Sequence, residues 1–284
     1  RNNPQTAGIT TYPAVWGLLR FISGTASAWA LIGASAWALG ILADNNNHSL
    51  AGFIYTGVGL GIALTGVICI VASRPEISSA QLWLLLGITS VLIVIWPVKN
   101  LYRSQTLSPY KQAQFPPVMA PGSAGLILCY GCLGFGYILP ATFLPVLARN
   151  LIDDPQLFGL TWPVFGIAAA ISTILASGFL KNYSRLSIWI FCNAMMAAGV
   201  ILPVFRITYV ALGVAALLVG GTFMVITRVG WQEARSRAAA NPVRLLGLMA
   251  GAFAVGQLTG PLIPSILNLV THDYDSALNY SLVI

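Results

Sequence analysis

Charged residues are scarce in this sequence. Asp, Glu, Lys and Arg together make up 7% of its 284 residues, whereas hydrophobic residues make up 57% and the mean hydropathy is +0.81. A soluble domain carries roughly 25% charged residues, because its surface faces water. Too few charges are present to cover a globule of this size. The composition therefore excludes an ordinary soluble protein and predicts a chain that faces lipid on most sides.

Acidic residues are rarer than basic ones, at 7 against 14, which gives a formal net charge of +7. A basic balance can indicate a nucleic-acid partner. In this chain, however, the basic residues lie mostly in short gaps between apolar runs, where the cytoplasmic loops of membrane proteins hold them. We therefore expect no nucleic acid among its partners.

Residues typical of metal, redox and hydrolytic sites are also few. The sequence has 4 cysteines and 2 histidines, and both histidines fall in gaps between apolar runs. Cys129 and Cys132 have the spacing of a redox or zinc motif, but they lie in an apolar run, where cysteine packs as a small apolar residue. No nucleotide-binding G-x-x-x-x-G-K-[ST] motif is present. We expect no cofactor, no metal and no enzymatic activity.

Long apolar runs dominate the chain. A helix that spans a membrane needs about 20 mostly apolar residues, and eight runs fit that length. They are rich in Leu, Ala and Gly and contain prolines, which membrane helices tolerate. The runs cover residues 14–42, 50–72, 81–98, 124–148, 157–180, 186–205, 207–227 and 245–270, and a ninth begins near residue 277. The sequence therefore predicts an all-α fold, a polytopic membrane helical bundle.

Basic residues in the gaps predict the orientation of these helices. The gaps at 99–123, 181–185 and 228–244 hold most of the Lys and Arg residues, and they lie on one side if every run spans. The positive-inside rule places that side in the cytoplasm. The gap at 43–49 does not follow this pattern, because it falls on the predicted cytoplasmic side but contains no Lys or Arg. The proline-rich segment 99–123 is then interpreted as a cytoplasmic linker between two bundles.

Two short matches indicate an internal repeat. Segment 57–66 is matched by 251–260, where a glycine is followed at the same spacing by Leu-Thr-Gly, and Gly24-Thr25 is matched by Gly221-Thr222. The offsets are 194 and 197 positions. A parallel repeat of this kind occurs in transporters. The first run would then be the fourth helix of a first half, three helices would be missing before it, and the complete protein would have twelve.

Glycine pairs predict close helix contacts. Gly-x-x-x-Gly pairs occur at 57–61, 247–251 and 256–260. Small residues one turn apart let the backbones of two membrane helices approach each other. We interpret all three pairs as contact surfaces between helices.

Four stretches carry a resemblance to a known family. They read GFGYILPATFLPVLAR at 134–149, DDPQLFGLTWPVFG at 153–166, GGTFMVITRVGWQEARSRA at 220–238 and AGAFAVGQLTGPLIPS at 250–265. Over nearly the whole chain the sequence resembles the YbfB/YjiJ branch of the major facilitator superfamily.

The resemblance implies a fold of two six-helix bundles, of which this chain lacks about the first three helices and most of the last. Residues 1–98 would be the remainder of the N-terminal bundle, with helices 4–6. Residues 99–123 would form the cytoplasmic linker. Residues 124–284 would be the C-terminal bundle, with helices 7–11 and the start of helix 12.

Segment 18–28 is similar to the fourth-helix motif of the superfamily. Arg20 and Gly24 match it, and Ser23 stands where glutamine is usual. The superfamily's antiporters also carry a Gly-Pro pair in the fifth helix, which the second run lacks. The resemblance therefore does not secure antiport.

Segment 178–186 looks like a degraded copy of the superfamily's loop motif between paired helices. Gly178 and Leu180 match the motif, Asn182 replaces its acidic residue, and Arg185 comes one position early. Without the acidic residue, the motif only weakly supports gating by a charge relay.

Arg20 is a charge within an apolar run. A charge at the centre of a membrane helix costs at least roughly 2.5–3.5 kcal/mol on insertion scales, so it usually faces a water-filled cavity or a partner. Arg20 would then bind a substrate anion or take part in proton coupling, and the resemblance implies the latter. The alternative is an arginine near the helix end that extends to the lipid headgroups.

Five uncharged residues complete the set of candidate site residues. Tyr130 and Tyr137 share one helix face, and they either offer hydroxyls and rings to a substrate or serve as packing and interfacial residues. Gln257 requires a partner in lipid, either a substrate or a neighbouring helix. Trp162 is either a site residue or part of the aromatic belt. Thr222 either lines a cavity or packs beside the neighbouring glycines.

These features predict a secondary active transporter that moves a small organic solute by alternating access. The resemblance implies that protons drive it in the export direction. Proton-coupled uptake of an organic anion is one alternative, and a transporter-like sensor or scaffold is another. The expected partners are the solute, protons and the lipid bilayer. We expect a multi-pass monomer in the bacterial cytoplasmic (inner) membrane.

Overall fold

A computed structural model describes residues 13–44, 51–72, 77–103, 121–151, 159–180, 182–205, 208–238, 242–263 and 266. Over these ranges the chain is helical and contains no strand. Each of the eight apolar runs forms a helix, which confirms the all-α prediction; the ninth run lies outside the described residues. The helices are α1 (Pro13–Asp44), α2 (Ala51–Ala72), α3 (Ser79–Arg103), α4 (Ser123–Leu151), α6 (Thr161–Phe179), α7 (Arg185–Phe205), α8 (Tyr209–Arg237) and α9 (Pro242–Thr259).

Seven of the described helices, all except α1, are long and apolar enough to cross a membrane. The sequence predicts a span at α1 as well. The side chains of some α1 residues lie outside the described part, so the span predicted there stays a prediction. The remaining seven helices are enough to make the chain a multi-pass membrane protein.

Serine and threonine side chains cap the starts of α3 and α8. At α3, the Ser78 backbone N–H donates to Gln81 Oε1 at 2.8 Å, and the Gln81 N–H donates back to Ser78 Oγ at 3.3 Å. At α8, Thr208 Oγ1 accepts from the Ala211 N–H at 3.2 Å. Such caps satisfy backbone donors that the first helical turn leaves without partners, and they fix where each helix begins.

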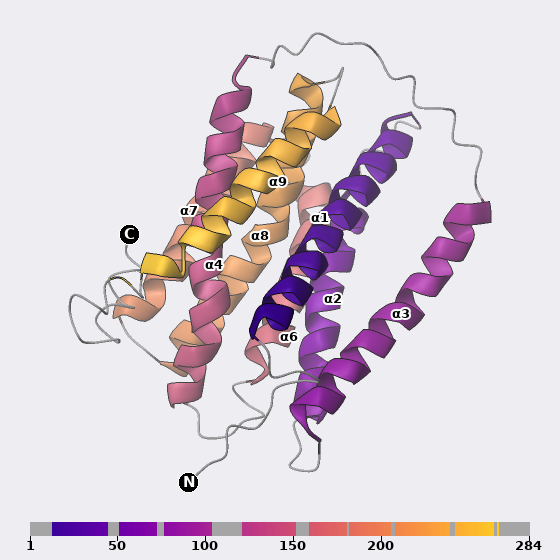
Figure 1. Ribbon diagram of the computed structural model, residues 1–284. Coiled ribbons are helices and arrows are strands. Elements are labelled where there is room, and N and C mark those ends of the chain that lie inside the picture. The colour runs from indigo at the N-terminus through magenta and orange to yellow at the C-terminus, as the bar shows by residue number, and fades with distance from the viewer. Residues whose placement is uncertain are drawn as a thin grey trace.

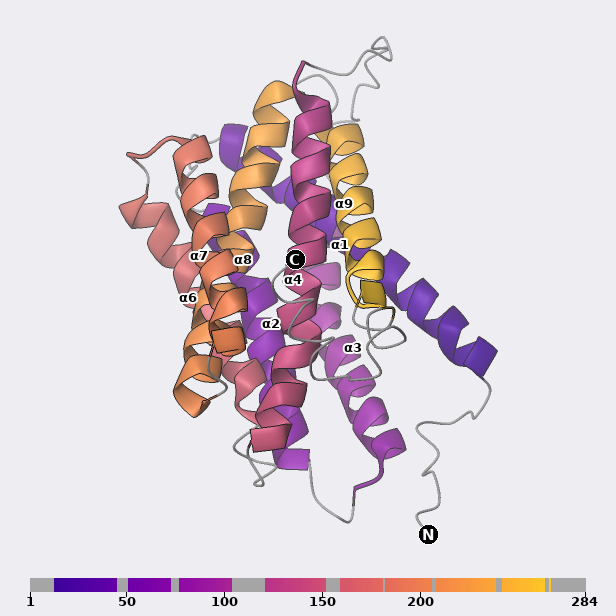
Figure 2. The ribbon, with the colours of Figure 1, turned by 90° about the vertical axis from the view of Figure 1, so that its left-hand side faces the viewer.

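Helix α8 lies at the centre of the bundle (Figures 1 and 2). It packs chiefly against α6 and α7 and also contacts α2, α4 and α9. Every residue from Thr222 to Trp231 is buried, as expected for a helix that is surrounded on all sides. Among the described elements the α3 backbone lies close only to α2, while its Trp83 side chain meets Arg20 of α1; Figure 1 shows α3 at one edge of the molecule.

Three glycines seven residues apart bring α2 against α6. A Cβ atom on Gly59 would lie 2.5 Å from the Ala170 backbone nitrogen, and one on Gly66 would lie 2.7 Å from Pro163 Cδ. A Cβ on Gly52 would overlap Ser177 Oγ. The two backbones therefore approach closely along the whole length of the α2–α6 interface, which only residues without side chains permit.

Only one of the three Gly-x-x-x-Gly pairs forms the predicted helix contact. Gly256 and Gly260 of the third pair lie against Gly131 and Ile138 of α4. At the first pair, 57–61, and the second, 247–251, a Cβ would meet nothing within 4 Å, so the predicted contacts there are wrong for the described residues. A four-residue spacing places two glycines on one face of a helix, but it does not specify which face meets a neighbour.

The threonines matched in the internal repeat make the same local hydrogen bond in both copies. Thr65 donates its hydroxyl to the Gly61 carbonyl at 2.9 Å, and Thr259 donates to the Val255 carbonyl at 3.1 Å. Thr25 and Thr222 likewise both donate to the carbonyl four residues earlier. Threonines outside the matched segments, such as Thr56, make this bond as well, so the repeat stays a prediction.

The predicted helix ends are wrong at two places. Helix α8 continues to Arg237 instead of ending at residue 227, and an ion pair between Glu233 and Arg237, one turn apart, stabilises the added turns. Helix α3 continues to Arg103, into the predicted linker, whose residues 104–120 lie outside the described part. Helix α9 ends at Thr259, but residues 262, 263 and 266 are also helical and residues 267–270 lie outside the described part, so the predicted end at residue 270 stays a prediction. The division into two bundles stays a prediction as well.

Candidate functional site

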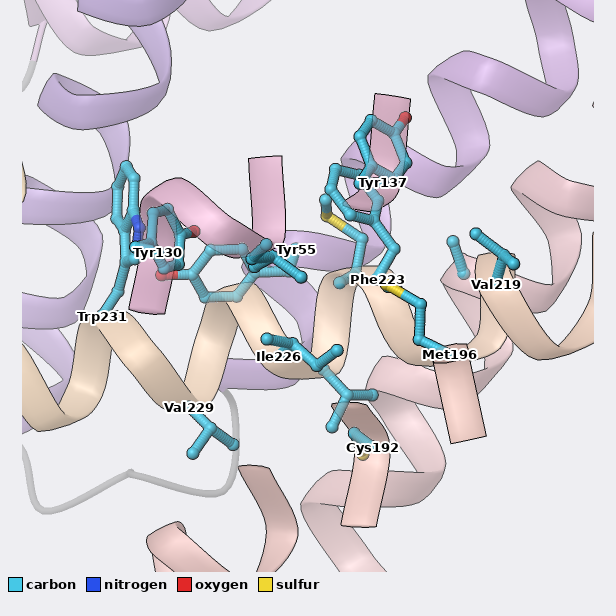
Figure 3. Packing of buried hydrophobic residues seen from close by; sticks show 14 of the residues in the cluster. Tyr55, Tyr130, Tyr137, Cys192, Met196, Val219, Phe223, Ile226, Val229 and Trp231 are labelled. Carbon is cyan, nitrogen blue, oxygen red and sulfur yellow. The ribbon is translucent and has the colours of Figure 1, made fainter. Parts of the chain in front are cut away.

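Aromatic rings from four helices meet in the interior. Tyr137 of α4 stacks on Phe223 of α8, with ring centroids 4.0 Å apart and planes 9° apart (Figure 3). Phe165 of α6 and Phe253 of α9 lie 6.3 Å and 6.0 Å from the Tyr137 ring. We call these four rings, together with Tyr130 and Trp162, the aromatic cluster. In this structure the rings pack against one another, and Tyr130, Tyr137, Phe165 and Phe223 are buried.

Tyr130 extends the aromatic cluster along α4. Its ring lies 5.5 Å from that of Phe253, and its hydroxyl lies beside the side chains of Thr227 and Trp231. Tyr55 of α2 meets Trp231 edge to face, with centroids 6.5 Å apart. Figure 3 shows Tyr55, Tyr130 and Trp231 side by side, so this end of the cluster carries polar groups from both α2 and α8.

Three further predicted residues lie at or near the aromatic cluster. Trp162 meets Phe165 edge to face at 5.8 Å. Thr222 is buried, but its hydroxyl donates to the Leu218 carbonyl at 2.7 Å and is therefore engaged within its own helix. Gln257 is half-buried on α9, one turn beyond Phe253.

Arg20 lies apart from the aromatic cluster. It is exposed on α1, and its guanidinium carbon lies 4.9 Å from the centroid of the Trp83 ring on α3. A cation over an indole face is attracted by the negative charge of the π system. The structure thus brings Tyr130, Tyr137 and Trp162 together and places Arg20 elsewhere.

The loop motif ends in a cluster of ion pairs. Leu180 caps α6 by donating its N–H to the Ala176 carbonyl at 3.3 Å, and Gly178 and Asn182 are exposed beside it. Arg185, the first residue of α7, lies 3.2 Å from a carboxylate oxygen of Glu233. That interaction ties the start of α7 to the end of α8.

Arg237 completes this cluster, since its Nε donates to the other Glu233 oxygen at 2.8 Å. We call Arg185, Glu233 and Arg237 the ion-pair cluster. Glu233 falls in the gap at 228–244 that the sequence predicts as a loop, but the structure places it within helix α8.

Arg228 is a buried residue that sequence reasoning missed. The sequence assigns it to a loop after the seventh run, yet it lies inside α8 with 9% of its surface exposed. One terminal nitrogen, Nη1, donates to Ser177 Oγ at 2.6 Å and to the Thr173 carbonyl at 3.4 Å, both on α6. The signal in the sequence was the uncharged segment Val-Gly-Trp that follows Arg228, which continues the helix and is buried in the structure.

A hydrogen bond links α2 to α6 beside Arg228. The Thr56 and Thr173 hydroxyl oxygens lie 3.0 Å apart and form a hydrogen bond across the α2–α6 interface, in which either hydroxyl can be the donor. Ser177, which accepts from Arg228, also donates to the Thr173 carbonyl at 2.8 Å. Polar side chains from three helices therefore meet at the end of the interface where α6 ends.

No group of three or more His, Cys, Asp or Glu side chains that would suit a metal ion occurs among the described residues. The four cysteines are free thiols, and Cys129 and Cys132 are exposed on α4. The geometry in the described part of the chain therefore offers hydroxyls, rings and cations rather than a metal centre.

Comparison with curated proteins finds no match. The sequence does match, over residues 5–283, the family described as the uncharacterised MFS-type transporter YbfB. That match covers nearly the whole chain, and it agrees with a bundle in which seven described helices can cross a membrane. The chain therefore belongs to this family, and it is a multi-pass membrane transporter of the major facilitator superfamily.

Proposed function

We propose that the chain is part of a secondary transporter that exports a small organic solute in exchange for protons, by alternating access. The observation that carries this proposal is the α2–α6 interface, where glycines hold two backbones in contact. Such a surface has few interlocking side chains to hinder movement. In secondary transporters one bundle rocks against the other around a central site.

The aromatic cluster is the proposed site of the solute. It combines rings from α4, α6, α8 and α9 with the hydroxyls of Tyr130 and Tyr137. A small organic molecule with an apolar body would pack against the rings, and the hydroxyls would fix its orientation. Thr222, Gln257 and Trp162 are proposed to contact it when the bundles separate.

The ion-pair cluster is the proposed latch at one end of the bundle. Gly178, Leu180 and Asn182 shape the turn that presents Arg185 to Glu233. Partly exposed ion pairs are weak, typically about 0.2–1 kcal/mol, so they can form and break in a transport cycle. The proposed latch lies on the cytoplasmic side, together with segment 99–123, because basic residues collect there.

Proton coupling and export are inferred from the family resemblance, and Arg20 is the proposed coupling residue. The transporter would act as a monomer in the bacterial cytoplasmic membrane, without catalysis. Its closest alternative is proton-coupled uptake of an organic anion, which the buried cation Arg228 favours. Export exchanges the solute for a proton, whereas uptake moves both in the same direction, so everted and right-side-out vesicles can distinguish the two.

The test is a proton-exchange assay on the complete protein. Everted membrane vesicles would be given an inside-acid pH gradient that a pH-sensitive dye reports, and metabolites and drugs would be added one at a time. We expect at least one solute to collapse the gradient in wild type but not in Arg20→Ala. Arg244→Ala, which removes an exposed charge from α9, is the matched control and should behave as wild type.

Three results would count against the proposal. If Arg20→Ala and wild type respond alike, Arg20 is not the coupling residue. If no solute collapses the gradient, yet an organic anion enters right-side-out vesicles together with protons, uptake replaces export. If neither assay detects a solute, the sensor or scaffold alternative is favoured.

A further inference from the structure

Four buried side-chain atoms have no hydrogen-bond partner among the described residues. They are Ser35 Oγ of α1, the Tyr55 hydroxyl of α2, and Arg228 Nε and Trp231 Nε1 of α8. Arg228 is 9% exposed, and the other three residues are 1% exposed or less. Buried polar atoms in native structures nearly always have partners, so a group of exceptions requires an explanation.

The four atoms belong to one place in the bundle. The Tyr55 ring lies edge to face against Trp231 at 6.5 Å, and its hydroxyl lies beside the Ser35 side chain and within electrostatic range of Arg228. Figure 3 shows Tyr55 and Trp231 adjacent, with Tyr130 next to both. The Trp231 indole N–H lies beside the Tyr130 hydroxyl in the same way, but neither contact has the distance and angle of a hydrogen bond. Polar atoms from α1, α2 and α8 therefore lie close together without well-formed hydrogen bonds.

Donors predominate in this group. The Trp indole and the Arg guanidinium can only donate hydrogen bonds, and the two hydroxyls can donate or accept. No side chain in the group is an acceptor only. A ligand that satisfied all four would supply acceptor atoms, and Arg228 adds a positive charge that favours a negative ligand. A carboxylate has this combination, because its two oxygens accept several hydrogen bonds and match the edge of a guanidinium.

Arg228 has no acidic partner among the side chains that the structure describes. Glu233 is the one acidic side chain among them, and both of its oxygens are engaged, by Arg185 at 3.2 Å and Arg237 at 2.8 Å. The contacts of Arg228 with Ser177 and Thr173 use Nη1 and leave Nε unused. A buried charge without a counter-charge is unfavourable, so a purely structural role would not favour arginine here.

We propose that Arg228, Tyr55, Trp231 and Ser35 form the binding site for the carboxylate of the transported solute, which is an aromatic organic anion. The adjacent Tyr130 ring leads into the aromatic cluster, where the ring of the solute would pack. The groups are buried in this structure, so the solute enters when α2 and α8 separate. This inference rests on the proposed transport function and narrows its substrate class.

The test is a binding measurement on the complete protein in detergent, without any pH gradient. Benzoate, phenylacetate and 4-hydroxybenzoate would be compared with their uncharged primary amides by thermal unfolding, because a ligand that binds the native state raises its melting temperature. The variants would be Arg228→Gln, Arg228→Lys and Tyr55→Phe. Arg244→Gln, with the same loss of charge on an exposed helix face, is the matched control.

We expect at least one carboxylate, and none of the amides, to raise the melting temperature of wild type and Arg244→Gln. Arg228→Gln should lose at least 90% of the affinity, Arg228→Lys should keep part of it, and Tyr55→Phe should weaken binding several-fold. The melting temperature of each variant without ligand establishes that it is folded; if Arg228→Gln does not fold, the conclusion rests on Arg228→Lys and Tyr55→Phe.

Three outcomes would overturn the inference: no carboxylate binds wild type, carboxylates and amides bind equally, or the Arg228 and Tyr55 variants bind as wild type does. The result is separable from the test of the proposed function. Carboxylate binding without gradient collapse would leave the site in place and remove proton-coupled export. Gradient collapse by uncharged solutes alone would keep the transport function and remove the carboxylate site.

Discussion

Arg20 and Arg228 both lie in apolar helices, but their surroundings are opposite. Arg20 is exposed on α1 and lies over the Trp83 ring of α3, and nothing lies within 4 Å of a Cβ on the nearby Gly24. Arg228 is buried where α2, α6 and α8 meet, and the glycines of α2 there permit no added carbon atom. The first region is loosely packed and the second is tightly packed.

The difference shows that an arginine in an apolar run does not by itself indicate a functional site; the packing around its side chain must also be known. At Arg20 the charge can be solvated or lie over a ring at small cost. At Arg228 the same side chain is deprived of water and keeps an unused donor, so its presence is unfavourable for folding unless something binds to it. The four predictions below test this comparison, from the largest expected effect to the smallest.

The largest expected change in stability comes from adding one methyl group to a glycine of the tightly packed region, compared with the same change in the loosely packed region. In Gly59→Ala the new carbon would lie 2.5 Å from the Ala170 backbone nitrogen, and backbone atoms cannot move aside. We expect a loss of about 2–3 kcal/mol or more of stability, measured by thermal or denaturant unfolding in detergent. Gly24→Ala, with open space around it, should be neutral or stabilising by up to about 1 kcal/mol. Equal effects would contradict the difference in packing.

Replacing each arginine by methionine tests the cost of the buried charge. Without ligand, Arg228→Met should be neutral or stabilise the protein by about 1–2 kcal/mol, because a buried donor without a partner is removed while the side-chain volume is kept. Arg20→Met should change stability by less than about 1 kcal/mol. Unfolding curves of the two variants and wild type measure both. A strong loss of stability in Arg228→Met would mean that another group already balances its charge.

Glu233→Gln tests the ion-pair cluster, which lies at the end of α8 just beyond the tightly packed region. The substitution removes the pairs with Arg185 and Arg237. Since these side chains are partly exposed, the expected loss is about 1 kcal/mol at low salt. Repeating the unfolding at about 1 M salt should reduce the difference from wild type, because screening weakens exposed pairs. A loss that does not depend on salt would argue against an electrostatic origin.

The smallest expected effect is at Trp83. Trp83→Leu removes the ring under Arg20 and keeps an apolar side chain on α3. We expect a stability change of about 0.5–1 kcal/mol, the usual size for a cation over an aromatic ring at an exposed site. A double-mutant cycle with Arg20→Met in the same unfolding assay isolates the pair. A coupling near zero would show that the contact contributes nothing.

The helices were predictable from the sequence because a membrane helix needs only length and apolar composition. The eight runs, the membrane location and the family were all read correctly in this way. Helix ends were not, because a charge such as Arg228 interrupts an apolar run whether it sits in a loop or in a helix. The Val-Gly-Trp segment after Arg228 could have indicated a helix, but the partners on α6, Thr173 and Ser177, are seen only in the structure.

The site was predictable in part. Tyr130 and Tyr137 share a helix face by their spacing alone, and the structure places both in the aromatic cluster. Tyr55, Ser35 and Trp231 gave no sequence signal, because hydroxyls and indoles are common in membrane helices. Glycine spacing was misleading because it does not specify which face of a helix meets a neighbour. The contacts of α2 come from glycines seven residues apart, and the four-residue pair at 57–61 faces away.

The central claim is that α2 and α6 separate during transport, and a reversible cross-link tests it most directly. Thr56→Cys and Thr173→Cys would be combined in the complete protein after Cys69, Cys129, Cys132 and Cys192 are replaced by serine, since the two hydroxyls lie 3.0 Å apart. Solute-driven proton exchange would then be measured before oxidation, after oxidation and after reduction, with each single-cysteine variant as a control. The account predicts that the disulfide stops exchange and that reduction restores it. Full exchange in the cross-linked protein would contradict alternating access across this interface.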